Sequence, residues 1–170
     1  MSAAVKLREA RFFLELLDAL ETRKSSLTED ASCGEEASYL MSAVLNSLYS
    51  ALEQAKPLVG VECVQRYKAE HSLIFKGGGG LRNVTVHDRH VGPDHSGYIA
   101  PAGDALKCDL RKRPKLVSEA EAALPRGHVN LSLGANHYVE VDGSLVDITE
   151  LCFAQYYALT AFLKEHQIVT

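Results

Sequence analysis

The sequence lacks long apolar runs, and its first residues lack the apolar segment of a secretory leader. A helix that crosses a membrane needs ~20 consecutive, mainly apolar residues, and no stretch of this chain approaches that length. A leader needs an uninterrupted apolar stretch, whereas charged residues recur every few positions from Lys6 onward. We therefore expect a cytoplasmic protein that makes no contact with a membrane.

Cysteines are few and are never closely paired. The four cysteines stand singly, without a Cys-x-x-Cys pair, so the sequence does not favour a disulfide or zinc framework. We expect reduced thiols that serve mostly as small core residues: Cys33, Cys63, Cys108 and Cys152. No cofactor is expected.

A large excess of charge of one sign is also absent. The net charge of -4 gives no general attraction for nucleic acid, so contact with RNA requires a local basic patch. The apolar share of 46% and charged share of 24% are those of a soluble globular protein. A chain of 170 residues can form one domain that buries roughly 70% of its unfolded surface.

Apolar residues recur with the period of an amphipathic helix near both ends of the chain. The first helix is expected over residues 4–24, with this apolar stripe: Val5, Phe12, Phe13, Leu16, Leu17 and Leu20. Asp147 is expected to cap a last helix, with this buried stripe: Ile148, Leu151, Cys152, Tyr156, Leu159, Phe162 and Leu163.

Two further helices are expected in the first half of the chain. Ser32 and Glu35 form the sequence pattern of a capping box at the start of the second helix, which Pro57 is expected to end. The third helix is expected over residues 58–76, with His71 as a hydrogen-bonded core residue on its apolar face.

The region 90–145 has a different character. Residues 90–114 are rich in Gly, Pro, Asp and His and show no periodicity, which is typical of a long loop. Ser118 begins another capping-box pattern, which predicts a short helix that ends before Pro125.

Two alternating runs, residues 128–133 and 137–142, are joined by Gly134-Ala135-Asn136 and predict a β-hairpin. The sequence thus predicts a single, mainly α domain over residues 1–170. We expect an up-and-down bundle of four to five helices with an inserted β-hairpin at about 128–142.

Four consecutive glycines, Gly77 to Gly80, precede Leu81-Arg82-Asn83-Val84-Thr85-Val86-His87. Each glycine costs about 1 kcal/mol relative to alanine within a helix, so we expect the chain to bend there and a short helix to begin at Leu81. In such a helix Arg82 and His87 lie near the same end, about 140° apart around the axis. A guanidinium that forks onto a phosphate and an imidazole that titrates near neutral pH are suited to phosphodiester chemistry.

This Arg-Asn-x-x-x-His sequence, placed late in a set of amphipathic helices, resembles the motif of the HEPN superfamily of all-α nucleotide-binding domains. The family signature is an arginine, four to six residues and a histidine, with a polar residue favoured after the arginine. Arg82, Asn83 and His87 match it. The resemblance extends over about residues 4–90 and includes the pattern of Glu36 to Ser50.

The resemblance implies metal-independent RNA cleavage by a homodimer, of the kind found in toxin and defence systems. His87 is then the general base or acid at a ribose hydroxyl, Arg82 binds the scissile phosphate, and Asn83 orients one of them. An antitoxin is an implied partner. The alternative is a HEPN-like module that binds a nucleotide, RNA or a partner such as a nucleotidyltransferase without cleaving.

Basic residues close to the motif are candidate contacts for an RNA backbone: Arg89, Arg111, Lys112 and Arg113. A solvated surface is the alternative for this charge run. A third possibility is that the histidines and aspartates between His87 and His95 bind a metal ion.

Overall fold

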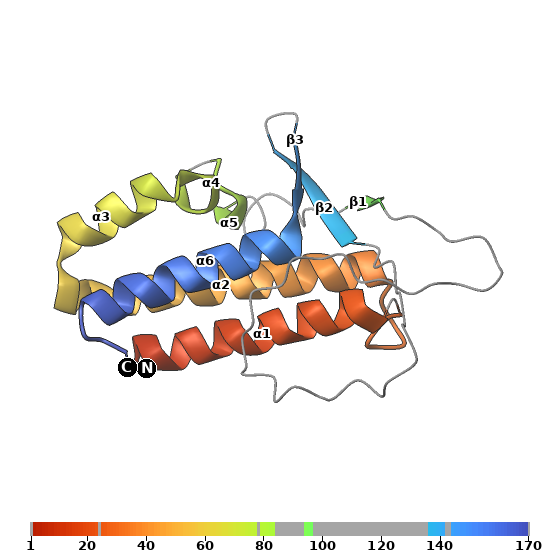
Figure 1. Ribbon diagram of the computed structural model, residues 1–170, viewed down its shortest axis with the longest axis horizontal. Helices are drawn as coiled ribbons and strands as arrows, with labels where there is room; N and C mark the ends of the chain where they lie inside the picture. Colours follow the sequence, from red (N-terminus) through yellow and green to blue (C-terminus); the bar gives the residue numbers. More distant parts are fainter. Residues whose placement is uncertain are drawn as a thin grey trace, which may run out of the picture.

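The computed structural model describes residues 2–23, 25–77, 79–83, 94–96, 136–141 and 144–169, and these form a mainly helical fold with a small antiparallel sheet (Figure 1). The helices are α1 (Ala3–Arg23), α2 (Cys33–Val59), α3 (Val61–Glu70), α4 (Ser72–Phe75), α5 (Leu81–Asn83) and α6 (Ile148–Glu165). The strands are β1 (Asp94–Ser96), β2 (Asn136–Val141) and β3 (Ser144–Asp147). None of the described helices is at once long and apolar enough to cross a membrane.

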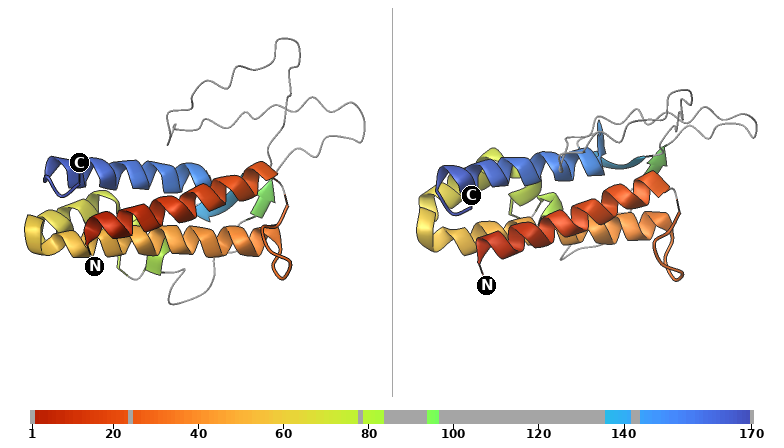
Figure 2. Two further views of the ribbon diagram at one scale, coloured as in Figure 1. Left: turned by 90° about the horizontal axis from the view of Figure 1, so that it is seen from below. Right: turned by 60° about the horizontal axis from the view of Figure 1, so that its bottom comes forward.

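The three long helices α1, α2 and α6 pack side by side. The N- and C-terminal ends of the chain lie at the same end of the molecule (Figures 1 and 2). Their shared interior is aliphatic, and the largest fully buried side chains include Leu14, Leu17, Leu48, Leu52 and Leu159. Removal of this apolar area from water is the main stabilising contribution to the fold.

Helix α1 confirms the helix expected over residues 4–24 and buries Leu17 and Leu20 as expected, but the rest of its buried stripe differs. Its core-facing residues are Ala3, Leu7, Ala10, Leu14, Leu17, Leu20 and Glu21. Phe12, which was expected in the stripe, is 56% exposed. The helix carries apolar residues around more than half of its circumference, so the periodicity alone did not decide which side packs against α2 and α6.

Helix α2 begins as expected and ends later than expected. The Ser32 hydroxyl accepts the Glu35 N–H at 3.3 Å, and the Glu35 carboxylate accepts the Ser32 N–H at 2.9 Å, which confirms the capping box. Pro57 does not end the helix, which continues to Val59. A proline in the last turn removes one hydrogen bond but keeps a helical φ, so the break falls at Gly60, whose φ is +90°.

The third expected helix, residues 58–76, is divided into α3 and α4 at His71. The His71 ring lies 4.3 Å from the Tyr67 ring, yet the residue is partly exposed instead of fully buried. Its φ of -106° and ψ of 43° are not helical, so the residue separates α3 from α4. Its intermediate burial places it at the edge of the core.

The chain bends at the glycines as expected, and α5 begins at Leu81. The sheet differs from the expectation: β2 pairs with β3 over Tyr138–Val141 and with β1 over Asn136–Tyr138. Asn136, expected in a turn, is therefore a strand residue. The loop expected over 90–114 contains the strand β1 at Asp94–Ser96, and the rest of that loop lies outside the described residues. The segment 128–133, which was expected to pair with 137–142, and the short helix expected from Ser118 lie outside them as well.

Helix α6 confirms the expected cap and nearly the whole expected stripe. The Asp147 carboxylate accepts the N–H groups of Thr149 and Glu150 at 2.9 and 3.0 Å. Phe162 alone of the stripe is partly exposed. At the other end the N–H groups of Gln167 and Ile168 donate to Lys164 and Leu163, both at 2.9 Å, which is the hydrogen-bond pattern of a Schellman motif.

Candidate functional site

Arg82 lies on α5, directly after a close turn of the backbone at Gly80. The Gly80 N–H donates to the Lys76 carbonyl, and the Asn83 N–H donates to the Gly80 carbonyl, both at 2.9 Å. A Cβ at Gly80 would stand 2.6 Å from the Ile74 carbonyl oxygen and 2.7 Å from backbone atoms of Lys76. No side chain fits there, so glycine allows α4 and α5 to approach closely enough to place Arg82 over α2.

The Arg82 guanidinium is held by groups from two helices. Its Nε donates to Asn46 Oδ1 on α2 at 3.2 Å, and its Nη1 donates to Asn83 Oδ1 at 2.9 Å. Its Cζ lies 4.1 Å from the centre of the Tyr49 ring, which is the geometry of a cation–π contact. Asn46 in turn donates from Nδ2 to Ser42 Oγ at 3.5 Å. The arginine is therefore fixed on a polar stripe of α2.

The Tyr49 ring also carries a second cation. The Lys68 Nζ lies 4.4 Å from its centre and forms an ion pair with Glu53. The hydrogen bond from Lys68 lowers the pKa of the Glu53 carboxyl, against the opposing effect of burial, and Lys56 adds to the lowering. The surface of α2 next to Arg82 is thus a compact set of charged groups around one aromatic ring.

The structure brings together two of the three residues of the expected motif. Arg82 and Asn83 are in direct contact on α5, whereas His87 lies outside the described residues. The expected RNA contacts lie outside them as well: Arg89, Arg111, Lys112 and Arg113. Of the 87–95 segment considered for metal binding, only the backbone of Asp94 and His95 in β1 is described.

Asn46 and Tyr49 were not expected as partners of Arg82. They occupy positions i and i+3 of α2 and therefore lie on one face. The polar Asn46 lies between the buried residues Leu45 and Leu48. Such a polar position within an apolar pattern is a local signal that the side chain has a specific partner. The identity of the partner, 36 positions away, is a tertiary property.

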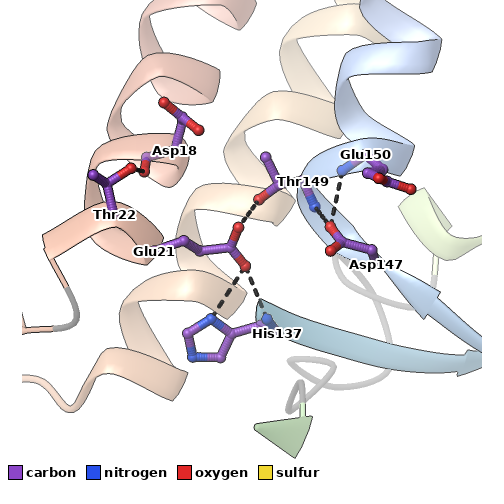
Figure 3. A network of polar contacts seen from close by, with 7 residues as sticks. All are labelled: Asp18, Glu21, Thr22, His137, Asp147, Thr149 and Glu150. Atoms are coloured by element: carbon purple, nitrogen blue, oxygen red, sulfur yellow. Dashed lines mark hydrogen bonds and ion pairs between the residues drawn. The ribbon is translucent and has the colours of Figure 1, made fainter. Parts of the chain in front are cut away.

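A second polar cluster, also not anticipated, joins α1, β2 and α6 (Figure 3). The Glu21 carboxylate accepts the His137 backbone N–H at 2.8 Å and the Thr149 hydroxyl at 2.7 Å, and it lies 3.4 Å from His137 Nδ1. Burial, with the nearby Glu21 and Asp147 carboxylates, raises the pKa of the Cys152 thiol.

This cluster does not have the properties of a reaction site. Glu21 and His137 are only 1% and 3% exposed, so a substrate cannot reach them in this conformation. Cys152, with a raised pKa and no exposure, remains a neutral thiol at neutral pH. The cluster instead connects three elements through hydrogen bonds that a buried carboxylate requires.

Comparisons with protein-family models, with curated proteins and with solved structures find no match for this chain.

Proposed function

We propose that this chain is a HEPN-type, metal-independent endoribonuclease of a toxin or defence system, and that it acts as a homodimer. The observation that carries the proposal is the fixed position of Arg82. An arginine held by Asn46, Asn83 and Tyr49 is pre-organised, and a pre-organised cation stabilises the charge that develops on a phosphate in the transition state.

The proposed reaction uses two groups of the motif. His87 removes the proton from a ribose 2′-hydroxyl, whose oxygen attacks the adjacent phosphorus. Arg82 neutralises the charge that builds up on the non-bridging oxygens. The bond to the 5′-oxygen of the next nucleotide breaks, that oxygen takes up a proton from water, and His87 returns its proton to the solvent. The products are a 2′,3′-cyclic phosphate and a free 5′-hydroxyl.

The architecture supports a bundle of the HEPN type. The long helices α1 and α2 form an antiparallel pair, α6 packs against both, and α5 places Arg82 and Asn83 against α2. In a homodimer, two copies of Arg82 and His87 face each other across one groove, and RNA binds between them. In this proposal, Arg89 and the basic residues 111–113 contact the backbone of the bound RNA on either side of the cleavage site.

The test is cleavage of a labelled RNA by the full chain in the presence of EDTA. Arg82→Ala and His87→Ala are each expected to lower the rate by on the order of 10²–10⁴, because each removes a group that acts in the transition state. Arg66→Ala is the matched control, since Arg66 is an exposed arginine on α3. Wild-type rates in the Arg82→Ala protein would contradict the proposal.

A second candidate is a HEPN-like module that binds RNA, a nucleotide or a nucleotidyltransferase partner without cleaving. The same three contacts of Arg82 favour it. An arginine that already binds side chains of its own protein can stabilise a binding surface without taking part in a reaction. The two candidates differ in one measurement. If the wild-type chain binds RNA, leaves it intact, and loses affinity on Arg82→Ala, the binding module is the correct function.

A further inference from the structure

A groove of about 490 Å³ lies between the N-terminal half of α1 and the C-terminal half of α6. It is separate from the Arg82 region, which α2 and α5 form. Its volume is in the range of small-molecule sites. The walls carry Arg8 and Arg11 from α1 and Tyr157, Thr160 and Lys164 from α6.

One end of the groove is aliphatic. Leu7 of α1 faces Ile168 and Val169, which follow α6. The Schellman motif returns these two residues against the core. It requires Gln167 to adopt a φ of 58°, a left-handed conformation that is strained for a residue other than glycine. The aliphatic wall is thus held in place at an energetic cost.

The rest of the groove is cationic. Arg8 and Lys164 stand exposed on opposite walls, and neither has a carboxylate partner among the described residues. Arg11 differs, because its Nε donates to Glu15 at 2.8 Å. Among the described residues that line the groove, no side chain is a carboxylate. The positive charge of Arg8 and Lys164 is therefore available to an anion.

The tyrosines of the groove are engaged in packing. The Tyr157 ring stacks on Phe153 at 6.4 Å and meets the edge of Tyr156 at 5.7 Å, and Tyr156 is buried. Tyr157 is therefore partly covered by its neighbours, as Ile168 and Val169 are by the core. The aliphatic side chains of Ile168 and Val169 line the same groove as Arg8 and Lys164, which favours an anion with an aliphatic chain.

We propose that this groove binds a single-chain aliphatic anion with a carboxylate or phosphate head. The chain lies along Leu7, Ile168 and Val169, and the head lies between Arg8 and Lys164. This site is independent of RNA cleavage.

The test is isothermal titration of the full-length protein with decanoate and with decyl phosphate, both below their micelle-forming concentrations. We expect one saturable site for at least one of them. Arg8→Gln combined with Lys164→Gln should weaken binding about tenfold or more, equal to 1.4 kcal/mol or more, whereas Arg66→Gln should leave it unchanged. Ile168→Asp should abolish binding, because it places a carboxylate beside the aliphatic chain.

Comparison of ligands with different head groups identifies the class of ligand that the groove binds. Tighter binding of decanoate indicates a fatty acid, and tighter binding of decyl phosphate indicates a phosphorylated lipid; both support the proposal. Decyltrimethylammonium has the same chain with a positive head and should not bind. Equal affinity for this cation, preferential binding of AMP, an unchanged affinity in the double variant, or no saturable binding of either anion would overturn the proposal.

Discussion

At the scale of single residues, Gly80 has the most specific role among the described glycines. Three backbone atoms lie within 2.7 Å of the position that a Cβ would occupy, whereas Gly77 and Gly79 face open space. The four glycines look equivalent in the sequence. Of the three that the structure describes, only Gly80, where α4 and α5 meet, is required by close approach of the backbone.

Gly80→Ala is therefore expected to destabilise the protein by about 1–3 kcal/mol, because backbone atoms of Ile74 and Lys76 must move. The same shift should displace Arg82 and lower any RNA cleavage. The midpoint of urea unfolding, followed by circular dichroism, measures the stability. Gly79→Ala is the matched control and should leave stability unchanged or slightly raised. Equal midpoints for the two variants would show that the packing at Gly80 is looser than described.

At the scale of elements, the helix ends are determined by local hydrogen bonds. Ser32 and Asp147 supply the caps that α2 and α6 require. The Glu36 carboxylate accepts N–H groups of Leu27 and Thr28, both at 2.7 Å, and so secures the connection between α1 and α2. Burial acts to raise the pKa of Glu36, but these hydrogen bonds together with the Thr28 hydroxyl outweigh it and lower the pKa.

The end of α6 is the one place among the described residues where a non-glycine residue has a positive φ. Gln167→Gly should stabilise the protein by about 1 kcal/mol, because glycine adopts this conformation without a steric penalty. A rise in the thermal midpoint of a few degrees is the expected result. Gln167→Val should lower the midpoint, since a β-branched residue is disfavoured there. A lower thermal midpoint for Gln167→Gly would contradict the claim that the backbone of Gln167 is strained.

At the scale of the whole molecule, the buried Glu21 carboxylate connects the sheet to the helices. Its oxygens accept from His137 on β2 and from Thr149 on α6 (Figure 3). The aliphatic core lies along the rest of α1. A buried charge without partners is strongly destabilising, so this residue depends on the correct placement of all three elements.

Glu21→Leu should destabilise the fold by about 2–4 kcal/mol, because it leaves the buried His137 N–H and Thr149 hydroxyl without their acceptor. Glu21→Gln should cost less, since an amide can still accept from one and donate to the other. Chemical unfolding of each variant measures both values. Glu29→Gln, at an exposed position, should stay within about 0.5 kcal/mol of wild type. A neutral effect of Glu21→Leu would mean that water or another group replaces the carboxylate.

The sequence by itself determined the local features of this protein. Periodicity located α1, α2 and α6, the capping residues Ser32 and Asp147 located two of their starts, and the glycine run located the bend before Arg82. These features depend on contacts within a few positions of the chain, and such contacts leave a pattern in the residue order.

The tertiary structure alone decided which groups meet. It placed Leu14 instead of Phe12 in the core, carried α2 past Pro57, paired β2 with β1 and β3, and set Arg82 on Asn46. Arg82 and Asn46 are 36 positions apart, and Glu21 and His137 are 116 apart. Partners at such separations are selected by the packing of whole elements, because no local propensity links the two residues.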